Sequence, residues 1–464
     1  MPDPTPLRPE FTDGPPRLAV IGAGPSGLAM AKNALEAGID VTVFEQNHAV
    51  GGNWLFSEAP GHSSVYENTH IISSKTQSEY EDFPMPADYP DYPDHRQLQA
   101  YFEAYARHFG VLETIRFRHR VQRAEPAPGK RWRLRVETAD GLVLEETFTH
   151  LAVANGHHWD AKHPEYPGEF TGEYLHSREF RRVPERWRGK RVLIIGAGNS
   201  ACDVAVEVSR VTRDVALSLR SPQWFIPKYL LGQPTDALAA RSATWIPAFI
   251  GRPLLQRLLT RLQGPLRDYG LPEPDWAPYE AHPTVNQDLL PLIRHGRIRP
   301  RPAVERWDGD GVVFTDGARE PFDVVVAATG FWISFPFFDE RLIDFRTARK
   351  VPLFRRMLHP DLPTLYFIGL FQPLGCIWPL ADYQAMLACQ EMLGNWRRPK
   401  DLRAAIDKEL ANPHYDFRDS LRHSTEVDYA QFRAELLAEL KTCGIRIGPP
   451  PMGRPGRYRT GVHA

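Results

Sequence analysis

The chain has 464 residues, enough for about two or three domains, and its charged side chains nearly cancel, at a formal net charge of −1 at pH 7. This balance excludes the broad positive field of proteins that bind nucleic acids or acidic membrane surfaces. The 4 cysteines form no CxxC pair, and no uninterrupted apolar run reaches the roughly 20 residues of a membrane span. We therefore expect a cytoplasmic protein without a signal peptide, a metal site or a disulfide framework.

The first folded unit opens on a glycine-rich loop. After a proline-rich stretch at 1–16, expected to form a loose tail, come the apolar run 18–21, the sequence GAGPSG at 22–27 and a helical pattern. A strand, a glycine turn and a helix in this order let backbone N–H groups approach a pyrophosphate at the positive end of the helix. The next strand, 41–44, ends at Glu45, where a carboxylate accepts hydrogen bonds from a ribose 2′-hydroxyl and repels a 2′-phosphate. This loop is therefore predicted to hold FAD or NAD(H).

Further local patterns complete this first unit, which we assign to residues 17–165. Residues 101–109 predict an amphipathic helix. Residues 131–137 alternate between apolar and polar side chains as a strand, and 142–148 are expected to be its hairpin partner. The apolar run 151–154 then returns to the main sheet and stops at an Asn-Gly pair.

A second glycine-rich loop opens the next unit. The apolar run 192–195 leads into GAGNSA at 196–201, and the following strand, 215–219, ends at Arg220. Arg220 occupies the same structural place as the glutamate of the first unit with the opposite charge, and an arginine there forms charge-assisted bonds with a 2′-phosphate. The second loop is therefore predicted to bind NADP(H). The alternatives are that both loops are structural turns, or that Arg220 is a solvated surface residue.

The second unit, assigned to residues 166–328, contains an insertion at about 222–295 that is proline-rich and helical in places. Within it, leucines recur at helical spacing between arginines. This pattern is compatible with a cover over a substrate entrance, with an amphipathic element at a membrane or subunit surface, or with a helix packed on its own domain, which we favour. A hairpin is expected around residues 304–307 and 312–314.

The end of the chain returns to the first unit. A buried strand at 322–327 ends at the sequence ATG of 328–330, and the remaining residues, 329–445, are expected to fold back before a tail at 448–464. The sequence thus predicts an α/β fold with two Rossmann-like dinucleotide-binding domains. The second domain is inserted into the first and carries the helical insertion.

A family resemblance follows from the segment between the two loops. Residues 170–180 (FTGEYLHSREF) match FxGxxxHxxx(Y/F), the identifying pattern of flavin-containing monooxygenases, and the chain resembles this family over roughly residues 17–395. Other matching segments are 51–54, 82–84, 328–330, 367–370 and Gln384. We expect His176 of the motif to support the connection between the domains rather than to transfer a proton.

This resemblance implies FAD on the first domain and NADPH on the second, with the two reactive rings meeting at the cleft. It implies that hydride passes from NADPH to the flavin, and that reduced flavin captures dioxygen as a C4a-(hydro)peroxide. A nitrogen or sulfur atom of a small-molecule substrate then attacks the distal oxygen. The family also makes a homodimer an expectation.

The loops and the resemblance together assign cofactor-binding residues. Those expected at FAD are Gly22, Gly24, Ser26, Gly27, Glu45, Gly52, Asn53, Trp54, Ser73 and Val121. Those expected at NADPH are Gly196, Gly198, Asn199, Ser200, Ala201 and Arg220, and further cofactor contacts are Ala328, Thr329 and Gly330. No side chain is assigned as catalytic, because the flavin carries the chemistry. The residues expected near the flavin are Ile72, Ser73, Lys75 and Gln384.

One departure from the family affects the oxygenation step. Many members have an asparagine three residues before a lysine, and this chain has Ile72 before Lys75. Isoleucine offers only bulk and dryness, so the oxygenated flavin would depend on Ser73, Ser74 or backbone groups. Efficient oxygenation is therefore in doubt, and an NADPH oxidase or another non-oxygenating flavoprotein remains an alternative.

A second alternative is Baeyer–Villiger oxygenation of a ketone. That subgroup resembles FxGxxxHxxxW, whereas this chain has Phe180 at the last position, which favours oxygenation of nitrogen or sulfur. A disulfide reductase with two dinucleotide sites is disfavoured because it requires a redox dithiol beside the flavin.

Overall fold

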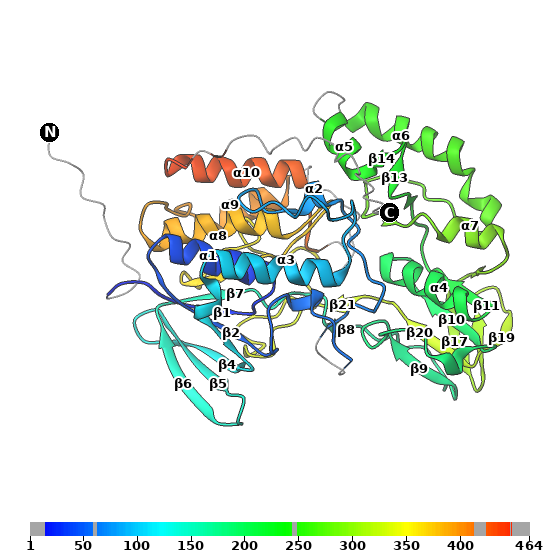
Figure 1. Ribbon diagram of the computed structural model, residues 1–464, viewed down its shortest axis with the longest axis horizontal. Helices are drawn as coiled ribbons and strands as arrows, with labels where there is room; N and C mark the ends of the chain where they lie inside the picture. The colour runs from blue at the N-terminus through cyan, green and yellow to red at the C-terminus, as the bar shows by residue number, and fades with distance from the viewer. Residues whose placement is uncertain (1–13, 59–62, 244–247, 413–423, 446, 448–464) are drawn as a thin grey trace, which may run out of the picture.

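The computed structural model describes residues 14–58, 63–243, 248–412, 424–445 and 447. The predicted tails therefore lie almost entirely outside the described residues. Two five-stranded parallel sheets form the centres of the molecule (Figure 1). In spatial order, the first sheet consists of β22 (Leu365–Phe367), β7 (His150–Val153), β1 (Arg17–Ile21), β2 (Asp40–Glu45) and β3 (Ile115–Phe117).

The first sheet is buried on both faces, as its continuous apolar strands require. Alternate residues of β1 point to opposite sides: Leu18 and Val20 pack under the helices, whereas Ala19 and Ile21 face an antiparallel sheet. Figure 1 shows the helices above this sheet and β4–β6 below it. The helices are α1 (Pro25–Glu36), α3 (His95–His108) and α8 (Trp378–Met392), and the strands are β4 (Arg120–Ala127), β5 (Arg131–Glu137) and β6 (Val143–Phe148).

The second sheet repeats this plan. Its strands in spatial order are β16 (Arg299–Arg301), β11 (Asp214–Ser218), β10 (Arg191–Ile195), β20 (Val324–Ala327) and β9 (Glu173–His176). Val192 and Ile194 face one core and Leu193 and Ile195 another. The first of these cores contains α4 (Asn199–Val211) and α7 (Leu289–Arg294), and the second contains β17 (Val304–Asp308) and β18 (Gly311–Phe314), which pair with β19 (Arg319–Pro321).

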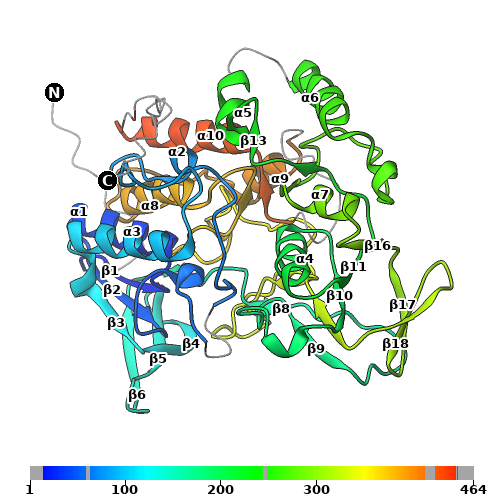
Figure 2. The ribbon, with the colours of Figure 1, turned by 45° about the vertical axis from the view of Figure 1, so that its right-hand side comes forward.

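The second sheet is inserted, in sequence, between two neighbouring strands of the first sheet. All strands of the second sheet lie in sequence between β7 and β22, which are neighbours in the first sheet, with Leu365 opposite Leu151. Figure 2 shows the two sheets side by side. The outgoing and returning connections are themselves paired, because β8 (Asp160–Ala161) runs antiparallel to β21 (Phe331–Trp332). The chain returns to the first sheet as β22.

The insertion is a small substructure closed at its base, where β12 (Phe225–Ile226) pairs with β15 (Thr284–Val285). It also contains β13 (Tyr229–Leu230), β14 (Gln233–Pro234), α5 (Thr235–Ala243) and α6 (Ala248–Gln263). One face of α6 buries Leu259 against Trp224 and Ile226, in agreement with packing on its own domain, whereas Phe249 is 79% exposed. Within the described ranges, no helix is long and apolar enough to cross a membrane.

Two short helices and a strand pair complete the C-terminal part: α9 (Leu402–Leu410), α10 (Tyr429–Thr442), and β23 (Gln372–Pro373) with β24 (Glu426–Val427). Figure 1 places α10 on the outer side of α8. The predicted helix at 101–109 begins earlier, at His95, because Asp94 and Gln97 form a capping box. Strand β4 was not predicted, because its buried positions are interrupted by a bulge between Val121 and Arg123.

Candidate functional site

The first glycine loop forms a tight cradle at the carboxyl end of β1. Gly22 has a φ of 103°, and a Cβ atom there would lie 2.6 Å from the carbonyl oxygen of Ala154, which follows β7. A Cβ atom on Gly27 would lie 1.9 Å from the carbonyl oxygen of Gly22. Helix α1 starts after Gly24, which has no side chain with which to cap it. The N–H groups of the first turn therefore face the loop, where a pyrophosphate fits.

Glu45 completes this cradle from the end of β2. Its side chain is buried; Oε2 accepts a hydrogen bond from the Ala23 N–H at 2.7 Å, and Oε1 accepts one from the Asn47 N–H at 2.7 Å. Burial raises the pKa of Glu45, and these two N–H donors oppose the shift by stabilising the ionised form. Glu45, the residue predicted to bind the ribose, therefore lies against the first glycine loop.

Two distant segments close the floor of the first loop. The Gly51 N–H donates to the Ala23 carbonyl at 3.1 Å, which places the 3₁₀ turn Gly52–Trp54 beside it. From the other side, a Cβ atom on Gly369, just beyond β22, would lie 2.2 Å from Oγ of Ser26. The predicted segments 51–54 and 367–370 therefore both meet at this loop.

Further residues predicted to contact FAD lie in the Gly52–Trp54 turn and in β4. Asn53 is exposed, and its Oδ1 accepts a hydrogen bond from the Ser64 N–H at 3.0 Å. The Trp54 ring packs edge-on against Trp378, with the ring centres 6.1 Å apart. Val121 is buried in β4 at the bulge. Asn53 and Trp54 lie together in the 3₁₀ turn.

The four residues expected near the flavin make different contacts. Ile72 is half-buried, and the adjacent Ser73 is buried with its Oγ 2.8 Å from Oγ of Ser78. Lys75 donates from Nζ to the carbonyl oxygens of Ala87 and Tyr89, at 3.0 and 2.7 Å. The ammonium group of Lys75 thus stabilises a neighbouring turn.

Gln384 also bonds to backbone groups. This side chain is fully buried in α8; Oε1 accepts the Gly369 N–H at 2.9 Å, and Nε2 donates to the carbonyl of Arg355 at 2.8 Å. Gln384 therefore fixes the segment that lies against Ser26, behind the first loop.

The second glycine loop has the same geometry as the first, except that alanine replaces the third glycine. Gly196 has a φ of 141°, and a Cβ atom there would lie 2.4 Å from the carbonyl oxygen of Ala328. The predicted strand end 328–330 thus lies against the loop, and Thr329 donates from Oγ1 to the carbonyl of Lys162. Ala201 stands in α4 where the first loop has its third glycine, so this helix start accepts a methyl group.

The insertion is bonded directly to the second loop. Oδ1 of Asn199 accepts the Val285 N–H at 2.8 Å, and Oγ1 of Thr284 donates to the Ala197 carbonyl at 2.6 Å. Ser200 is exposed, and Gly198 is the N-cap of α4. The contact with the insertion was not predicted, because nothing in the local sequence links residues 284–285 to the loop.

Arg220 lies exposed just beyond β11, at the place predicted for the 2′-phosphate ligand. A second cation is nearby. The pKa of Lys162 is lowered, first by burial and then by the positive charge of Arg220. The Lys162 ammonium lies 4.1 Å from the centre of the Trp332 ring. Two positive charges on this side of the second loop fit a phosphate, and Lys162 was missed because it lies in the connection between the sheets.

The motif at 170–180 includes β9, an edge strand of the second sheet. His176 is fully buried, and its Nδ1 accepts the Arg178 N–H at 3.1 Å, which places the ring proton on Nε2. Burial lowers the pKa of His176 to about 4, so the ring is neutral at pH 7. Its ring centre lies 5.3 Å from that of His163 and 5.4 Å from that of Phe331. These contacts support the predicted structural role at the domain connection.

Arg181, one residue beyond the motif, was not predicted as part of the site. Its buried guanidinium donates to the carbonyl oxygens of Ser57 and Ser63, at 2.6 and 2.7 Å. These bonds attach the end of the motif to the segment that follows the Gly52–Trp54 turn. Arg181 therefore attaches the chain that follows β9 of the second sheet to Ser57 and Ser63, near the first glycine loop.

Comparison with known proteins decides the family. Residues 16–444 match the model of the flavin-binding monooxygenase-like family. The chain belongs to this family. It is 35% identical to flavin-containing monooxygenase 5 of Mus musculus over 440 residues, which cover 90% of this chain and 82% of the relative. It is 33% identical to dimethylaniline monooxygenase [N-oxide-forming] 2 of Rattus norvegicus over 446 residues, covering 91% and 82%.

Solved structures agree on the α/β fold with parallel sheets. S-allyl-L-cysteine S-oxygenase from Allium sativum superposes with a TM-score of 0.69 at 22% identity, covering 94% of this chain and 90% of that one. OTEMO in complex with FAD and NADP gives a TM-score of 0.68 at 15% identity, covering 92% and 98%. The family match confirms the family, the monooxygenase class and the use of FAD and NADPH, all of which were predicted from the sequence.

Proposed function

We propose that the two cofactors are divided between the two sheets. FAD occupies the first glycine loop of a domain made of residues 17–165 and 329–445, and NADPH occupies the second loop, in residues 166–328. The opposite charges of Glu45 and Arg220 at equivalent strand ends support this division. The steric limits at both loops fit the close approach of a pyrophosphate.

We further propose that the enzyme oxygenates a nitrogen or sulfur atom of a small molecule. NADPH supplies two electrons, one atom of dioxygen is transferred to the substrate, and the other leaves as water. FAD, when bound, supplies the electron transfer and the activation of oxygen. The protein binds and orients the two cofactors, and its packed core keeps water away from the flavin ring.

The observation that carries this choice of substrate is the end of the motif. Phe180, where the ketone-oxygenating pattern has tryptophan, is buried 5.6 Å from the Tyr66 ring and 6.1 Å from the Trp187 ring, measured between ring centres. A relative that is 33% identical over 91% of this chain is named for N-oxide formation.

A specific observation keeps NADPH oxidation as a second candidate. Beside Ile72, the Oγ of Ser73 already bonds with Ser78, and the N–H of Ser74 donates to Oδ2 of Asp236 at 2.6 Å. The polar groups of Ser73 and Ser74, the two residues that follow Ile72, thus already have hydrogen-bond partners. A poorly stabilised oxygen adduct would release hydrogen peroxide instead of oxygenating a substrate.

The test is a stoichiometry. The FAD enzyme is reduced with NADPH without oxygen and then mixed with oxygen and one of three probes: a tertiary aryl amine, an aryl methyl sulfide or a cyclic ketone. We expect the amine oxide or sulfoxide to account for most of the NADPH consumed. If the cyclic ketone is the only probe that is oxygenated, giving the ester, the enzyme is a ketone oxygenase and the proposal is wrong. Hydrogen peroxide equal to NADPH with every probe would replace it by the oxidase.

A further inference from the structure

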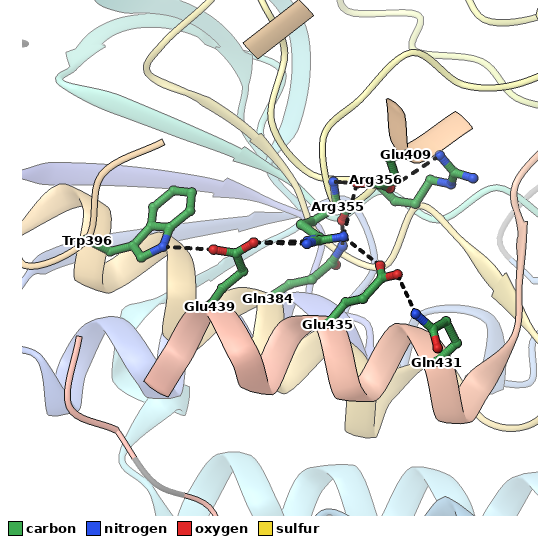
Figure 3. Close-up of polar contacts among 8 residues, drawn as sticks. All are labelled: Arg355, Arg356, Gln384, Trp396, Glu409, Gln431, Glu435 and Glu439. Atoms are coloured by element: carbon green, nitrogen blue, oxygen red, sulfur yellow. Dashed lines mark hydrogen bonds and ion pairs between the residues drawn. The ribbon is translucent and has the colours of Figure 1, made fainter. Parts of the chain in front are cut away.

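A cluster of buried charges lies behind the first glycine loop, at a turn between Phe354 and Leu358 (Figure 3). The turn places Arg355 and Arg356 at φ values of 51° and 52°, in the left-handed region that non-glycine residues rarely occupy. Turns of this kind normally use asparagine and glycine. Two adjacent arginines in this conformation persist only where their surroundings determine it.

The surroundings are three carboxylates from two C-terminal helices. Nη1 of Arg355 lies 2.6 Å from Oε2 of Glu435, and Nη2 lies 2.9 Å from Oε1 of Glu439, both on α10. The backbone N–H of Arg355 donates to Oε2 of Glu409, on α9, at 3.0 Å. Glu409 also lies 3.6 Å from Nη1 of Arg356. Figure 3 shows the Arg355 side chain facing Glu435 and Glu439.

This cluster is held out of water, so its charges interact strongly. The side chains of Glu409 and Arg356 are 3% and 2% exposed, and that of Arg355 is 16% exposed. Burial alone would lower the pKa of Arg355, but the charges of Glu409, Glu435 and Glu439 outweigh it and raise the pKa. Removing one partner from such a cluster leaves buried charges uncompensated.

The turn connects to the cofactor loop through one buried amide. The carbonyl oxygen of Arg355 accepts from Nε2 of Gln384, whose Oε1 accepts the Gly369 N–H. Gly369 in turn lies so close to Ser26 that a Cβ atom would overlap with Oγ. Because the amide has one donor end and one acceptor end, both bonds can form in only one orientation.

We propose that Arg355 is a positioning residue for FAD. Arg355 couples α9 and α10 to the first glycine loop through Gln384 and Gly369. The inference rests on the proposed placement of FAD at that loop. The ion cluster fixes the left-handed turn, the turn fixes the carbonyl that orients Gln384, and Gln384 sets the position of Gly369 against Ser26. The C-terminal helix α10 is then part of the machinery that retains FAD, although the contacts of Arg355 with it lie behind the loop.

The experiment measures FAD retention directly. Full-length Arg355→Met is prepared with FAD, and FAD release and rebinding are followed by flavin fluorescence well below the unfolding temperature. We expect FAD to bind at least about 10-fold more weakly than in the wild type. Arg398→Met is the matched control, because the Arg398 side chain is 14% exposed, pairs with Glu391 and donates to the Pro363 carbonyl at 2.7 Å, before the opposite end of β22. This control is expected to lower the melting temperature but to bind FAD within about 2-fold of wild type.

A double-mutant cycle tests the route. If the effect passes through the amide, Arg355→Met and Gln384→Met weaken FAD binding by similar factors, and the double variant is no weaker than either. Multiplying effects would overturn the coupling, as would unchanged FAD affinity in Arg355→Met. If Arg355→Met does not fold, Glu435→Gln combined with Glu439→Gln removes the helix partners at nearly constant volume and is judged by the same outcomes. A wild-type chain that failed to bind FAD would refute the proposed function, whereas tight wild-type binding with an unaffected Arg355 variant would refute only this inference.

Discussion

The two glycine loops follow one plan but differ in how firmly they are closed. At the first, Glu45 is buried and bonded to the loop, and the Gly52–Trp54 turn and Gly369 lie against it. At the second, Arg220 is exposed, a methyl group is accepted at Ala201, and the strand end at Ala328 and the base of the insertion lie against the loop.

With FAD and NADPH divided between the loops as proposed, the same fold holds its two cofactors in different ways. FAD is expected to stay bound through many turnovers, because several distant segments must separate before it leaves. NADPH must exchange in each cycle, and in the proposed arrangement the exposed Arg220 binds its extra phosphate without enclosing it. The electrostatic choice between the cofactors is thus combined with a steric one.

The largest expected effect comes from breaking the tight loop. Gly27→Ala places a Cβ atom 1.9 Å from the Gly22 carbonyl oxygen, so the loop must shift. We expect FAD binding to weaken at least about 100-fold, on the order of 3 kcal/mol. The measurement is the ratio of flavin to protein absorbance after gel filtration. The counterpart Ala201→Gly should leave the KM for NADPH within about 3-fold, and a yellow Gly27→Ala protein would contradict the comparison.

The next effect concerns the charge at the open loop. Arg220→Ala removes charge-assisted bonds worth about 1.5–3 kcal/mol, so the KM for NADPH should rise about 10- to 100-fold. The KM for NADH, which lacks the 2′-phosphate, should change by less than about 2-fold. Steady-state kinetics with both cofactors measure this. Equal losses with NADPH and NADH would remove the role assigned to Arg220.

Acid should act on both sheets through buried histidines. Burial lowers the pKa of His176, beside the second loop, and of His150, in the first sheet, to about 4, from about 6.5 when unfolded. Above pH 6.5 both histidines are neutral in the folded and in the unfolded chain, so the stability is full. As the pH falls towards 4, the unfolded chain binds protons that the folded chain does not, and the free energy of unfolding decreases. Each should contribute up to about 2 kcal/mol of lost stability at pH 5. Thermal unfolding across this range should show a shallower pH dependence in His176→Gln, and an unchanged slope would refute this reading.

The smallest change is expected for Lys162, the second cation near Arg220. Lys162 is only partly buried, and its ammonium stacks over Trp332. Lys162→Met should therefore raise the KM for NADPH by only about 3-fold, because a half-exposed charge is well screened. A rise as large as that of Arg220→Ala would show that both cations contact the phosphate equally.

Local patterns predicted the parts of the site that lie within a few residues of one another. Both glycine loops, the strands around them, and the acidic and basic residues at Glu45 and Arg220 follow from short stretches of sequence. The contacts of Lys75 and Gln384 could not be predicted in this way, because their partners are backbone groups that lie 12 and 29 residues away along the chain. The roles of Lys162 and Arg181 depend on how the two sheets are joined, which no local pattern reports.

The interrupted order of the first sheet has a consequence for biosynthesis. As the chain leaves the ribosome, β1, β2, β3 and β7 are available early, but the edge of β7 has no neighbour until Leu365–Phe367 emerges. All five strands of the second sheet are made in between, in one continuous stretch. The later-starting half of the protein can therefore finish folding first, while the earlier half waits with an open strand edge that is vulnerable to wrong pairing.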